Sequence, residues 1–196
     1  MNPIQSHFDQ ASAQYAKASA NGIWKFMRNS ESRNIVKMLP KINDATTALD
    51  LGCGSGYYSD LLKQLGVKNI TCVDFSEKML NQIKDQHCQK IQANIEDFQS
   101  SQKYDIILCA GALEFINKTF DVFKNVSSML NKSGCFILLY PEKKILAYFY
   151  QLYHKQHGIS VCLYNKNEIL SLAEKAGLIY SDSAQAFPFS TVIKFK

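Results

Sequence analysis

A glycine-rich turn that follows an apolar strand is the feature that most constrains the fold of this chain. Residues 48–56 read Ala-Leu-Asp-Leu-Gly-Cys-Gly-Ser-Gly, so an apolar run containing Asp50 leads directly into closely spaced glycines. Glycines at such a turn let the backbone approach a ligand closely and adopt positive φ without steric cost. The carboxylate of Asp50 would repel a diphosphate and attract a cationic or amino-bearing ligand. The run therefore predicts a nucleotide-type cofactor site.

Strands and helices alternate after this turn. The run 104–110 is apolar on both faces, which is typical of a buried strand in a parallel sheet. Alternating strands and helices form an open, mostly parallel sheet with right-handed crossovers, so the fold class is α/β. Strands are predicted near residues 46–51, 70–74, 88–93, 104–110, 135–140, 178–184 and 189–195.

Local signals predict several helix ends and turns. Ser76 is placed to cap a helix after the strand at 70–74, and Asn165 with Glu168 makes a capping-box pair for a helix that ends at Gly177. Residues 131–134 are predicted to form a turn.

The chain is predicted to form one structural domain with two parts. Residues 1–40 are polar and alanine-rich with isolated aromatic side chains, which indicates an N-terminal helical cap. Residues 41–196 form the α/β part, and 196 residues in total favour a single domain.

Composition limits the function classes. Lys and Arg exceed Asp and Glu by 22 to 17, and the lysines are scattered, which favours a solvated surface over a nucleic-acid interface. No signal peptide is predicted, and no apolar run approaches the roughly 20 residues that span a bilayer. The six cysteines include no C-x-x-C pair and are predicted to be reduced and partly buried in a cytoplasmic protein.

Candidate binding residues follow several of the predicted strands. Ligands of parallel sheets bind at the carboxyl ends of the strands. The glycine turn, Asp74, Asn94 and the segment 109–114 all fall at such ends, and an acid about 20 residues after a glycine turn can bind a ribose diol. The sequence therefore predicts one shared site at this edge of the sheet.

The motif at residues 50–56, Asp74 and two later stretches together resemble the class I S-adenosylmethionine-dependent methyltransferases; the stretches run from Tyr104 to Ile116 and from Met129 to Leu138. The resemblance is strong over residues 45–142 and looser to Gly177. The segment from His7 to Tyr15 is similar to the lead-in helix of the small-molecule branch, which includes ubiquinone, menaquinone and Mg-protoporphyrin methyltransferases.

This resemblance implies a Rossmann-like fold, with a mostly parallel seven-stranded sheet and helices on both faces. It implies S-adenosylmethionine as cofactor, S-adenosylhomocysteine as product, and methyl transfer to a small acceptor that is apolar or aromatic. The oligomeric state and the methylated atom are left open.

The resemblance also implies which residues bind the cofactor. Asp50 would lie near the amino group of its methionine part, through water, and Asp74 would accept both ribose hydroxyls. Asn94 stands where family members usually carry Asp and would contact the adenine. The implied cofactor-binding residues are Tyr15, Asp50, Gly52, Cys53, Gly54, Gly56, Asp74, Phe75, Met79, Asn94, Ile95, Cys109, Ala110 and Gly111.

No catalytic base is identified by the motifs. Phe115 occupies a position where many relatives have a histidine, so this chain lacks that imidazole. Methyl transfer from a sulfonium needs mainly alignment and exclusion of water, and a base only for a reluctant nucleophile. No metal-ligand cluster is recognised; His154 and His157 lie three residues apart, as a metal pair would, but favour a surface interpretation. The candidates for a base are Tyr140, Glu142, His154 and His157.

Residues 145–153 form an aromatic-rich segment with two open interpretations. It is either a lid over the acceptor or an amphipathic helix that packs on the sheet. Nearby lysines, among them Lys143 and Lys155, would suit a peripheral membrane contact.

Three other functions compete with this interpretation. A nicotinamide-dependent oxidoreductase usually carries G-x-G-x-x-G, whereas Gly52, Gly54 and Gly56 give G-x-G-x-G. A non-catalytic S-adenosylmethionine-binding regulatory protein would bind the cofactor without turnover. A methyltransferase acting on RNA or protein is disfavoured by the modest charge, and no nucleic-acid partner is expected.

Overall fold

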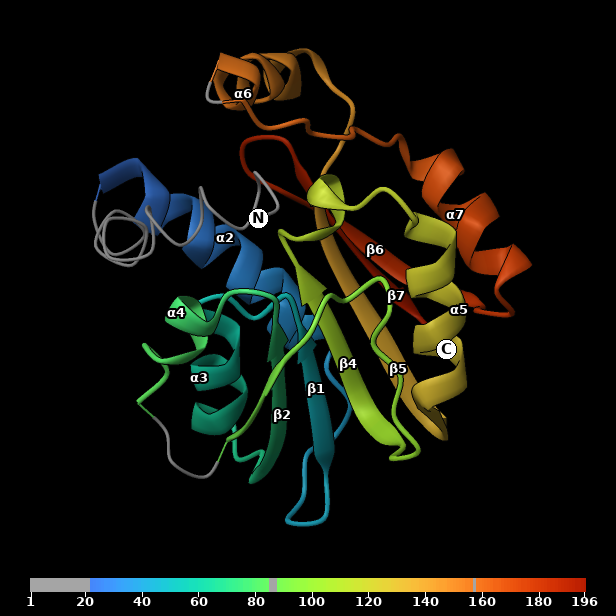
Figure 1. Cartoon of the computed structure of the whole chain (residues 1–196). Helices are drawn as coiled ribbons and strands as arrows, with labels where there is room; N and C mark the ends of the chain where they lie inside the picture. The colour runs from blue at the N-terminus through green and yellow to red at the C-terminus, as the bar shows by residue number, and fades with distance from the viewer. Residues whose placement is uncertain (1–21, 85–87, 157) are drawn as a thin grey trace.

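A seven-stranded sheet lies at the centre of the computed structural model, which describes residues 22–84, 88–156 and 158–196 (Figure 1). The strands lie in the order β3-β2-β1-β4-β5-β7-β6. β1 to β5 are parallel, and β7 runs antiparallel to both of its neighbours, which confirms the mostly parallel sheet. The strands are β1 (Thr47–Leu51), β2 (Asn69–Asp74), β3 (Gln89–Gln92), β4 (Tyr104–Ala110), β5 (Leu130–Pro141), β6 (Tyr180–Ala186) and β7 (Ser190–Phe195).

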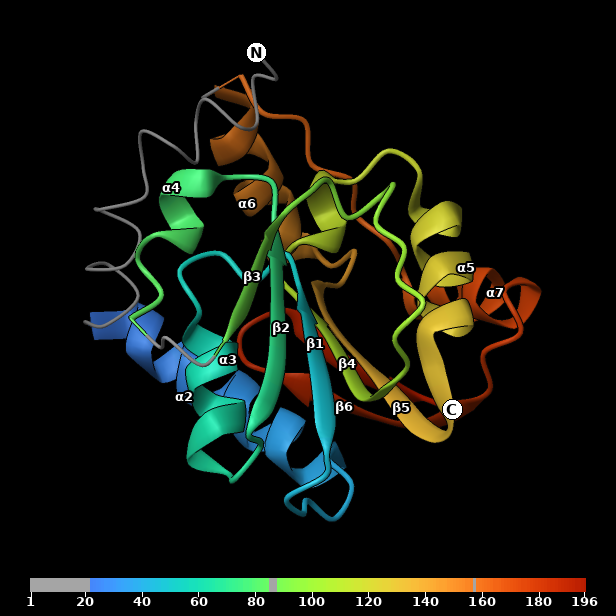
Figure 2. The same cartoon turned by 60° about the horizontal axis from the view of Figure 1, so that its bottom comes forward.

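Helices cover both faces of the sheet (Figure 2). Side chains of α2, α3 and α4 share a core cluster with one face, and side chains of α5 and α7 share a second cluster with the other. A 3₁₀ turn, η1 (Leu113–Phe115), follows β4, and α6 lies above the carboxyl ends of β4 and β5 in Figure 1. The helices are α2 (Gly22–Met38), α3 (Tyr57–Gln64), α4 (Glu77–Leu80), α5 (Thr119–Met129), α6 (Ile145–Gln156) and α7 (Lys166–Lys175).

β4 shows why the apolar runs become central strands. Ile106 and Leu108 belong to the core cluster under α2 and α3, whereas Ile107 and Cys109 belong to the cluster under α5 and α7. All four side chains are fully buried. A strand covered on both faces needs apolar residues at every position, as the sequence predicted.

The local capping signals are confirmed. The side chain of Ser76 accepts a hydrogen bond from the backbone of Met79 at 3.2 Å. Asn165 and Glu168 form the reciprocal capping box at the start of α7, and Gly177 adopts a φ of 82° just after that helix.

The turn predicted at residues 131–134 takes a different form. These residues belong to β5, where the pairing with β4 shifts from Tyr104 opposite Leu130 to Ile106 opposite Cys135. The extra residues of β5 form a bulge. Asn131 donates a hydrogen bond to Asp105 at 2.7 Å, which holds this part of β5 beside β4.

The expectation that all six cysteines are reduced is wrong for one pair. Cys72 of β2 and Cys88 are joined by a disulfide. β2 and β3 pair in parallel with Thr71 opposite Gln89, and this register brings Cys88 within 6.5 Å of Cys72, measured between Cα atoms. Sequence spacing alone does not reveal such a register. Cys53, Cys109, Cys135 and Cys162 are free thiols.

α2 is fixed to the antiparallel end of the sheet. Ser190 of β7 donates a hydrogen bond to Glu31 at 3.0 Å, and Asn34 donates one to the carbonyl of Gln185 at 2.9 Å. This part of the predicted cap therefore belongs to the packed domain. In the described ranges, no helix combines the length and the apolar character needed to cross a bilayer.

Candidate active site

The glycine turn between β1 and α3 forms one wall of a cavity. Gly52 and Gly54 have φ values of 71° and 53°. A Cβ atom on Gly52 would lie 2.4 Å from the Cβ of Ala112, so only glycine lets the turn pack against the segment after β4. A Cβ on Gly54 would meet no atom within 4 Å, which leaves space beside the turn for a ligand.

Asp74 connects this turn to the end of β2. Its two carboxylate oxygens accept hydrogen bonds from the backbone of Gly54 and of Ser76, each at 2.9 Å. A carboxylate oxygen can accept more than one hydrogen bond, so these two backbone bonds are compatible with binding of a diol. Asp74 thus combines a fixed position with the acceptor capacity that a ribose diol requires.

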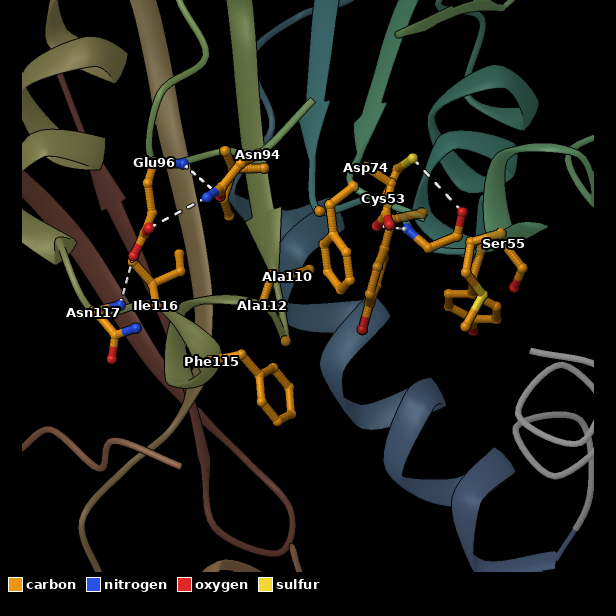
Figure 3. Close-up of a pocket in the computed structure, with 18 of the residues that line it drawn as sticks. Cys53, Ser55, Asp74, Asn94, Glu96, Ala110, Ala112, Phe115, Ile116 and Asn117 are labelled. Atoms are coloured by element: carbon orange, nitrogen blue, oxygen red, sulfur yellow. Dashed lines mark hydrogen bonds between the residues drawn. The ribbon is translucent and has the colours of Figure 1, made fainter. Parts of the chain in front are cut away.

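The cavity has a volume of about 330 Å³ and lies at the carboxyl ends of β1, β2 and β4. Small-molecule sites begin at about this size. Figure 3 shows Cys53 and Asp74 on one side, Asn94 and Glu96 on the other, and Phe115 between them. The lining residues are Arg28, Gly52, Cys53, Gly54, Ser55, Tyr57, Tyr58, Asp74, Phe75, Met79, Asn94, Ile95, Glu96, Ala110, Gly111, Ala112, Phe115, Ile116 and Asn117.

Most of the residues that the sequence singled out for the cofactor meet at this cavity. Those that line it are Gly52, Cys53, Gly54, Asp74, Phe75, Met79, Asn94, Ile95, Ala110 and Gly111. Asp50, Gly56 and Cys109 are not part of the lining. Tyr15 falls outside the described residues.

Asp50 lies behind the turn instead of in the cavity wall. Alternation along β1 points its side chain, like that of Ala48, toward the α3 face, where Ser59 donates a hydrogen bond to it at 2.6 Å. Burial raises the pKa of Asp50 to about 7, and the nearby charge of Asp74 acts in the same direction. The structure therefore does not bring Asp50 into contact with the cavity.

Asn94 lines the cavity and also stabilises the loop after β3. Its side-chain oxygen accepts a hydrogen bond from the backbone of Glu96 at 3.1 Å. Glu96 in turn accepts hydrogen bonds from the backbone of Asn117 at 2.6 Å and of Lys118 at 2.8 Å. Partial burial acts to raise the pKa of Glu96, but these hydrogen bonds lower it overall. The network joins two rims of the cavity (Figure 3).

Sequence reasoning missed the wall supplied by α2 and α3. The guanidinium of Arg28 lies 4.7 Å from the ring centre of Tyr57 and 5.3 Å from that of Tyr58. Tyr58 donates a hydrogen bond to Glu31 at 3.0 Å, and burial raises the pKa of Glu31. No motif marks these residues, because α2 reaches the cavity only through packing of the whole domain.

His154 is buried, so the interpretation of it as a surface residue is wrong. The buried side chains of α6 are Ala147 and His154, seven positions apart on one face of the helix. The His154 ring centre lies 5.5 Å from that of Phe115 and 4.4 Å from that of Tyr150. An imidazole from α6 therefore packs against the residue that stands in place of the expected histidine. His157 falls outside the described residues.

The other two candidates for a base do not line the cavity. Tyr140 is fully buried in the core under α5 and α7, and burial raises its pKa. Glu142 accepts hydrogen bonds from Thr191 at 2.7 Å and Gln185 at 3.0 Å, and it pairs with Lys144. Although burial acts to raise the pKa of Glu142, these contacts lower it. In the part of the chain that the structure describes, no cluster of three or more His, Cys, Asp or Glu side chains could hold a metal ion.

Comparison with known families supports the geometry. A family described as "Methyltransferase domain" matches residues 23–180. Trans-aconitate 2-methyltransferase of Escherichia coli is 28% identical over 116 residues, which is 57% of this chain and 46% of that enzyme. The chain thus spans about half the length of the curated relatives it matches.

Solved structures share the fold over nearly the whole chain. An S-adenosylmethionine-dependent methyltransferase of Thermotoga maritima, described as a possible histamine N-methyltransferase, superposes with a TM-score of 0.81 at 16% identity and covers 98% of both chains. Magnesium protoporphyrin IX methyltransferase of Synechocystis, solved with S-adenosylhomocysteine, gives 0.76 at 15% identity, covering 98% of this chain and 97% of the other. At these identities the likeness establishes the Rossmann-like fold.

Proposed function

The chain belongs to the methyltransferase domain family as a class I S-adenosylmethionine-dependent enzyme, and from this premise we propose that it methylates a small acceptor that is apolar or aromatic. The observation that carries the proposal is the cavity at the strand ends, where the turn at Gly52 and Gly54 meets Asp74. Relatives in the small-molecule branch, including trans-aconitate and magnesium protoporphyrin methyltransferases, support a small acceptor.

The residues present fit the cofactor. In this proposal Asp74 accepts the ribose hydroxyls, because its oxygens are fixed by backbone donors at the cavity wall and a carboxylate oxygen can accept more than one hydrogen bond. The open space beside Gly54 receives the methionine part. Phe75 and Met79 border the adenine on one side, and Ile95 with Asn94 borders it on the other. Gly56 supports the turn from behind, and the buried Asp50, hydrogen-bonded to Ser59, holds the strand that leads into it.

The chain's own contribution to the reaction is alignment and exclusion of water. S-adenosylmethionine, when bound, supplies an activated methyl group on a sulfonium. Ala110, Gly111 and Ala112 line the cavity with small side chains or none and would leave room there for that group, and Cys109 would support them from the core. Phe115 continues this wall toward α6 and keeps the acceptor side apolar. Holding the reactants in line can lower the barrier of such a displacement by several kcal/mol.

We assign α6 the role of acceptor lid. A helix that packed on the sheet by its apolar face would bury its large side chains, but Ile145 is 80% exposed and Phe149 is 68% exposed. The helix also lies above the carboxyl ends of β4 and β5, next to Phe115 (Figure 1). Together with Lys143 and Lys155, this apolar surface would also suit a peripheral membrane contact. α2, which reaches the cavity through Arg28, would form part of the cap on the opposite side.

Isothermal titration calorimetry tests the proposed cofactor. The purified protein is titrated with S-adenosylmethionine, S-adenosylhomocysteine and NADH. We expect micromolar binding of the first two and none of NADH, because Gly52, Gly54 and Gly56 give G-x-G-x-G instead of the G-x-G-x-x-G spacing that usually holds a pyrophosphate. Binding of NADH alone would contradict the proposal. Cofactor binding without turnover on any small acceptor would favour a regulatory protein instead.

A further inference from the structure

Glu114 is a buried carboxyl beside the cavity that the mechanism above does not use. It lies in η1, between Ala112 and Phe115, which both line the cavity. Tyr150 of α6 donates a hydrogen bond to its Oε1 at 3.3 Å. Among the described residues, its second oxygen, Oε2, is buried and accepts no hydrogen bond. Buried polar atoms in native proteins are nearly always hydrogen-bonded, so this oxygen needs an explanation.

The charged groups around Glu114 come from three elements. From α2, the charge of Glu31 acts to raise its pKa and that of Arg28 to lower it; Tyr150 of α6 lowers it by hydrogen bonding. Cys109 of β4 also lies close enough for Glu114 to raise the thiol pKa. Burial is the largest effect and raises the pKa of Glu114 to about 7.

The two buried acids of this region differ in their hydrogen bonds. Glu31 receives hydrogen bonds on both oxygens, from Tyr58 and from Ser190, each at 3.0 Å. Glu114 receives one side-chain hydrogen bond, on one oxygen. Because the two carboxyls repel each other when charged, a cation at Glu114 Oε2 would relieve the repulsion and supply the missing hydrogen bond.

Aromatic rings lie near the Glu114 carboxyl, which Tyr150 contacts through Oε1. Tyr150, which bonds Glu114, packs against His154 with ring centres 4.4 Å apart, and His154 packs against Phe115 with ring centres 5.5 Å apart. A carboxylate binds an organic ammonium group by charge-assisted hydrogen bonds, and nearby aromatic rings attract the same cation. Tyr150 and His154 belong to α6, so movement of this helix as a lid would open Oε2 to the cavity.

We propose that Glu114 binds the methyl acceptor and accepts its proton, and that the acceptor is an amine attached to an aromatic or apolar group. This inference rests on the proposed function. The acceptor ammonium gives a proton to the Glu114 carboxylate, and its nitrogen lone pair then bonds the methyl carbon. The pair of electrons of the breaking C–S bond goes to sulfur, which leaves a thioether. The protonated carboxyl of Glu114 afterwards releases its proton to water.

A matched set of probes tests the acceptor class. The protein is saturated with S-adenosylhomocysteine and titrated at pH 8 with 2-phenylethylamine, 2-phenylethanol and 3-phenylpropanoate. We expect the amine to bind at least about tenfold more tightly than the other two, because only the amine meets Glu114 with a positive charge. Equal or tighter binding of the alcohol or the acid, or no binding of the amine, would overturn the inference.

Substitutions then locate the effect at Glu114. Glu114→Gln is expected to weaken amine binding about 10- to 100-fold, while Tyr150→Phe, which removes one hydrogen bond, weakens it less. Glu174→Gln removes the same charge from the exposed surface of α7 and serves as the matched control. Affinity for S-adenosylhomocysteine should stay within about twofold in all three variants, since Glu114 does not line the cofactor cavity.

The pH dependence separates a proton acceptor from a structural residue. Amine affinity should rise between pH 6 and pH 8 in the wild type, because Glu114 ionises near 7 while an alkylammonium keeps its proton up to about pH 10. The rise should disappear in Glu114→Gln. A Gln variant that keeps the wild-type affinity and pH profile would refute the role of Glu114. Failure to bind S-adenosylhomocysteine would instead refute the proposed function.

Discussion

The two ends of the cavity are built in opposite ways. At the end formed by β1 and β2, Asp74 takes backbone hydrogen bonds on both oxygens and fixes the glycine turn. At the end where η1 borders the cavity and α6 packs against η1, Glu114 has an oxygen without a hydrogen bond from the described residues, and α6 exposes most of its large apolar side chains. The first end is preformed for one ligand. At the second end, a further ligand would give Glu114 the hydrogen bond it lacks and would cover apolar side chains of α6.

Two buried acids with similarly raised pKa values, Asp50 and Glu114, repeat this difference. Asp50 and Glu114 both have pKa values raised to about 7, mainly by burial. Ser59 donates a hydrogen bond to Asp50 at 2.6 Å, whereas the hydrogen bond from Tyr150 to Glu114 is 3.3 Å long. A raised pKa therefore does not by itself mark a functional acid. Asp50 has a short hydrogen bond from Ser59, whereas one oxygen of Glu114 accepts no hydrogen bond from the described residues.

Filling the space beside the turn should have the largest effect at the cofactor end. Gly54→Val is expected to weaken binding of S-adenosylhomocysteine by more than about 100-fold, because its side chain would occupy the open space beside Gly54. Calorimetry measures the affinity. Gly158→Val places the same side chain at a similar positive φ outside the cofactor cavity and controls for backbone strain. Tight binding by Gly54→Val would mean that the ligand lies elsewhere.

The raised pKa values predict how stability depends on pH. Both acids bind protons more strongly in the folded state, so their contribution to stability is full below about pH 4 and is lost as pH rises through about 7. Each can change the free energy of unfolding by at most about 1.4 kcal/mol per pH unit. Asp50→Asn should therefore make the free energy of unfolding decrease less steeply between pH 5 and pH 8. Urea unfolding at several pH values tests this, and a slope equal to that of the wild type would contradict it.

Removing the partner of Asp50 should have a smaller and purely structural effect. Ser59→Ala deletes the hydrogen bond to Asp50 and should cost about 1–3 kcal/mol of unfolding free energy at pH 8. Affinity for S-adenosylhomocysteine should hardly change, because Ser59 does not line the cavity. Urea unfolding and calorimetry measure the two quantities. A large loss of affinity with unchanged stability would reverse the assignment.

The smallest effect on stability is expected on α6. Phe149→Ser replaces an exposed side chain and should change the unfolding free energy by less than about 0.5 kcal/mol. The same variant should slow methyl transfer to an apolar acceptor if α6 is the lid. Thermal unfolding and turnover are compared with those of the wild type. A loss of stability like that of a core substitution would make α6 a packing helix.

The two ends also differ in what the sequence could predict. The glycine turn, Asp74 and the capping pair of Asn165 and Glu168 are local signals, in which a few neighbouring residues determine the backbone. The burial of His154 and the pairing of Cys72 with Cys88 depend on which helix face or strand register is chosen. These choices follow from packing between segments far apart in the chain, so spacing alone gave the wrong expectation for both.

The function of the acceptor end was harder to predict for the same reason. The sequence shows Phe115 where many relatives have a histidine. It does not reveal that His154 packs against Phe115 from a helix that begins 30 residues later in the chain. Arg28 and Glu31 reach the site on a helix that precedes the first strand. No sequence motif marks Glu114. It becomes a candidate for binding the acceptor because it is buried beside the cavity and one of its oxygens lacks a hydrogen bond from the described residues.

The most direct test of the account compares the affinity of the wild type and Asp74→Ala for S-adenosylhomocysteine by calorimetry. Loss of a charge-assisted contact of roughly 1.5–3 kcal/mol predicts binding weaker by about 10- to 100-fold. Asp44→Ala, at an exposed ion pair with Lys68, should bind as the wild type does. Unchanged affinity in Asp74→Ala would contradict the placement of the ribose at Asp74, and with it the assignment of this cavity to the cofactor.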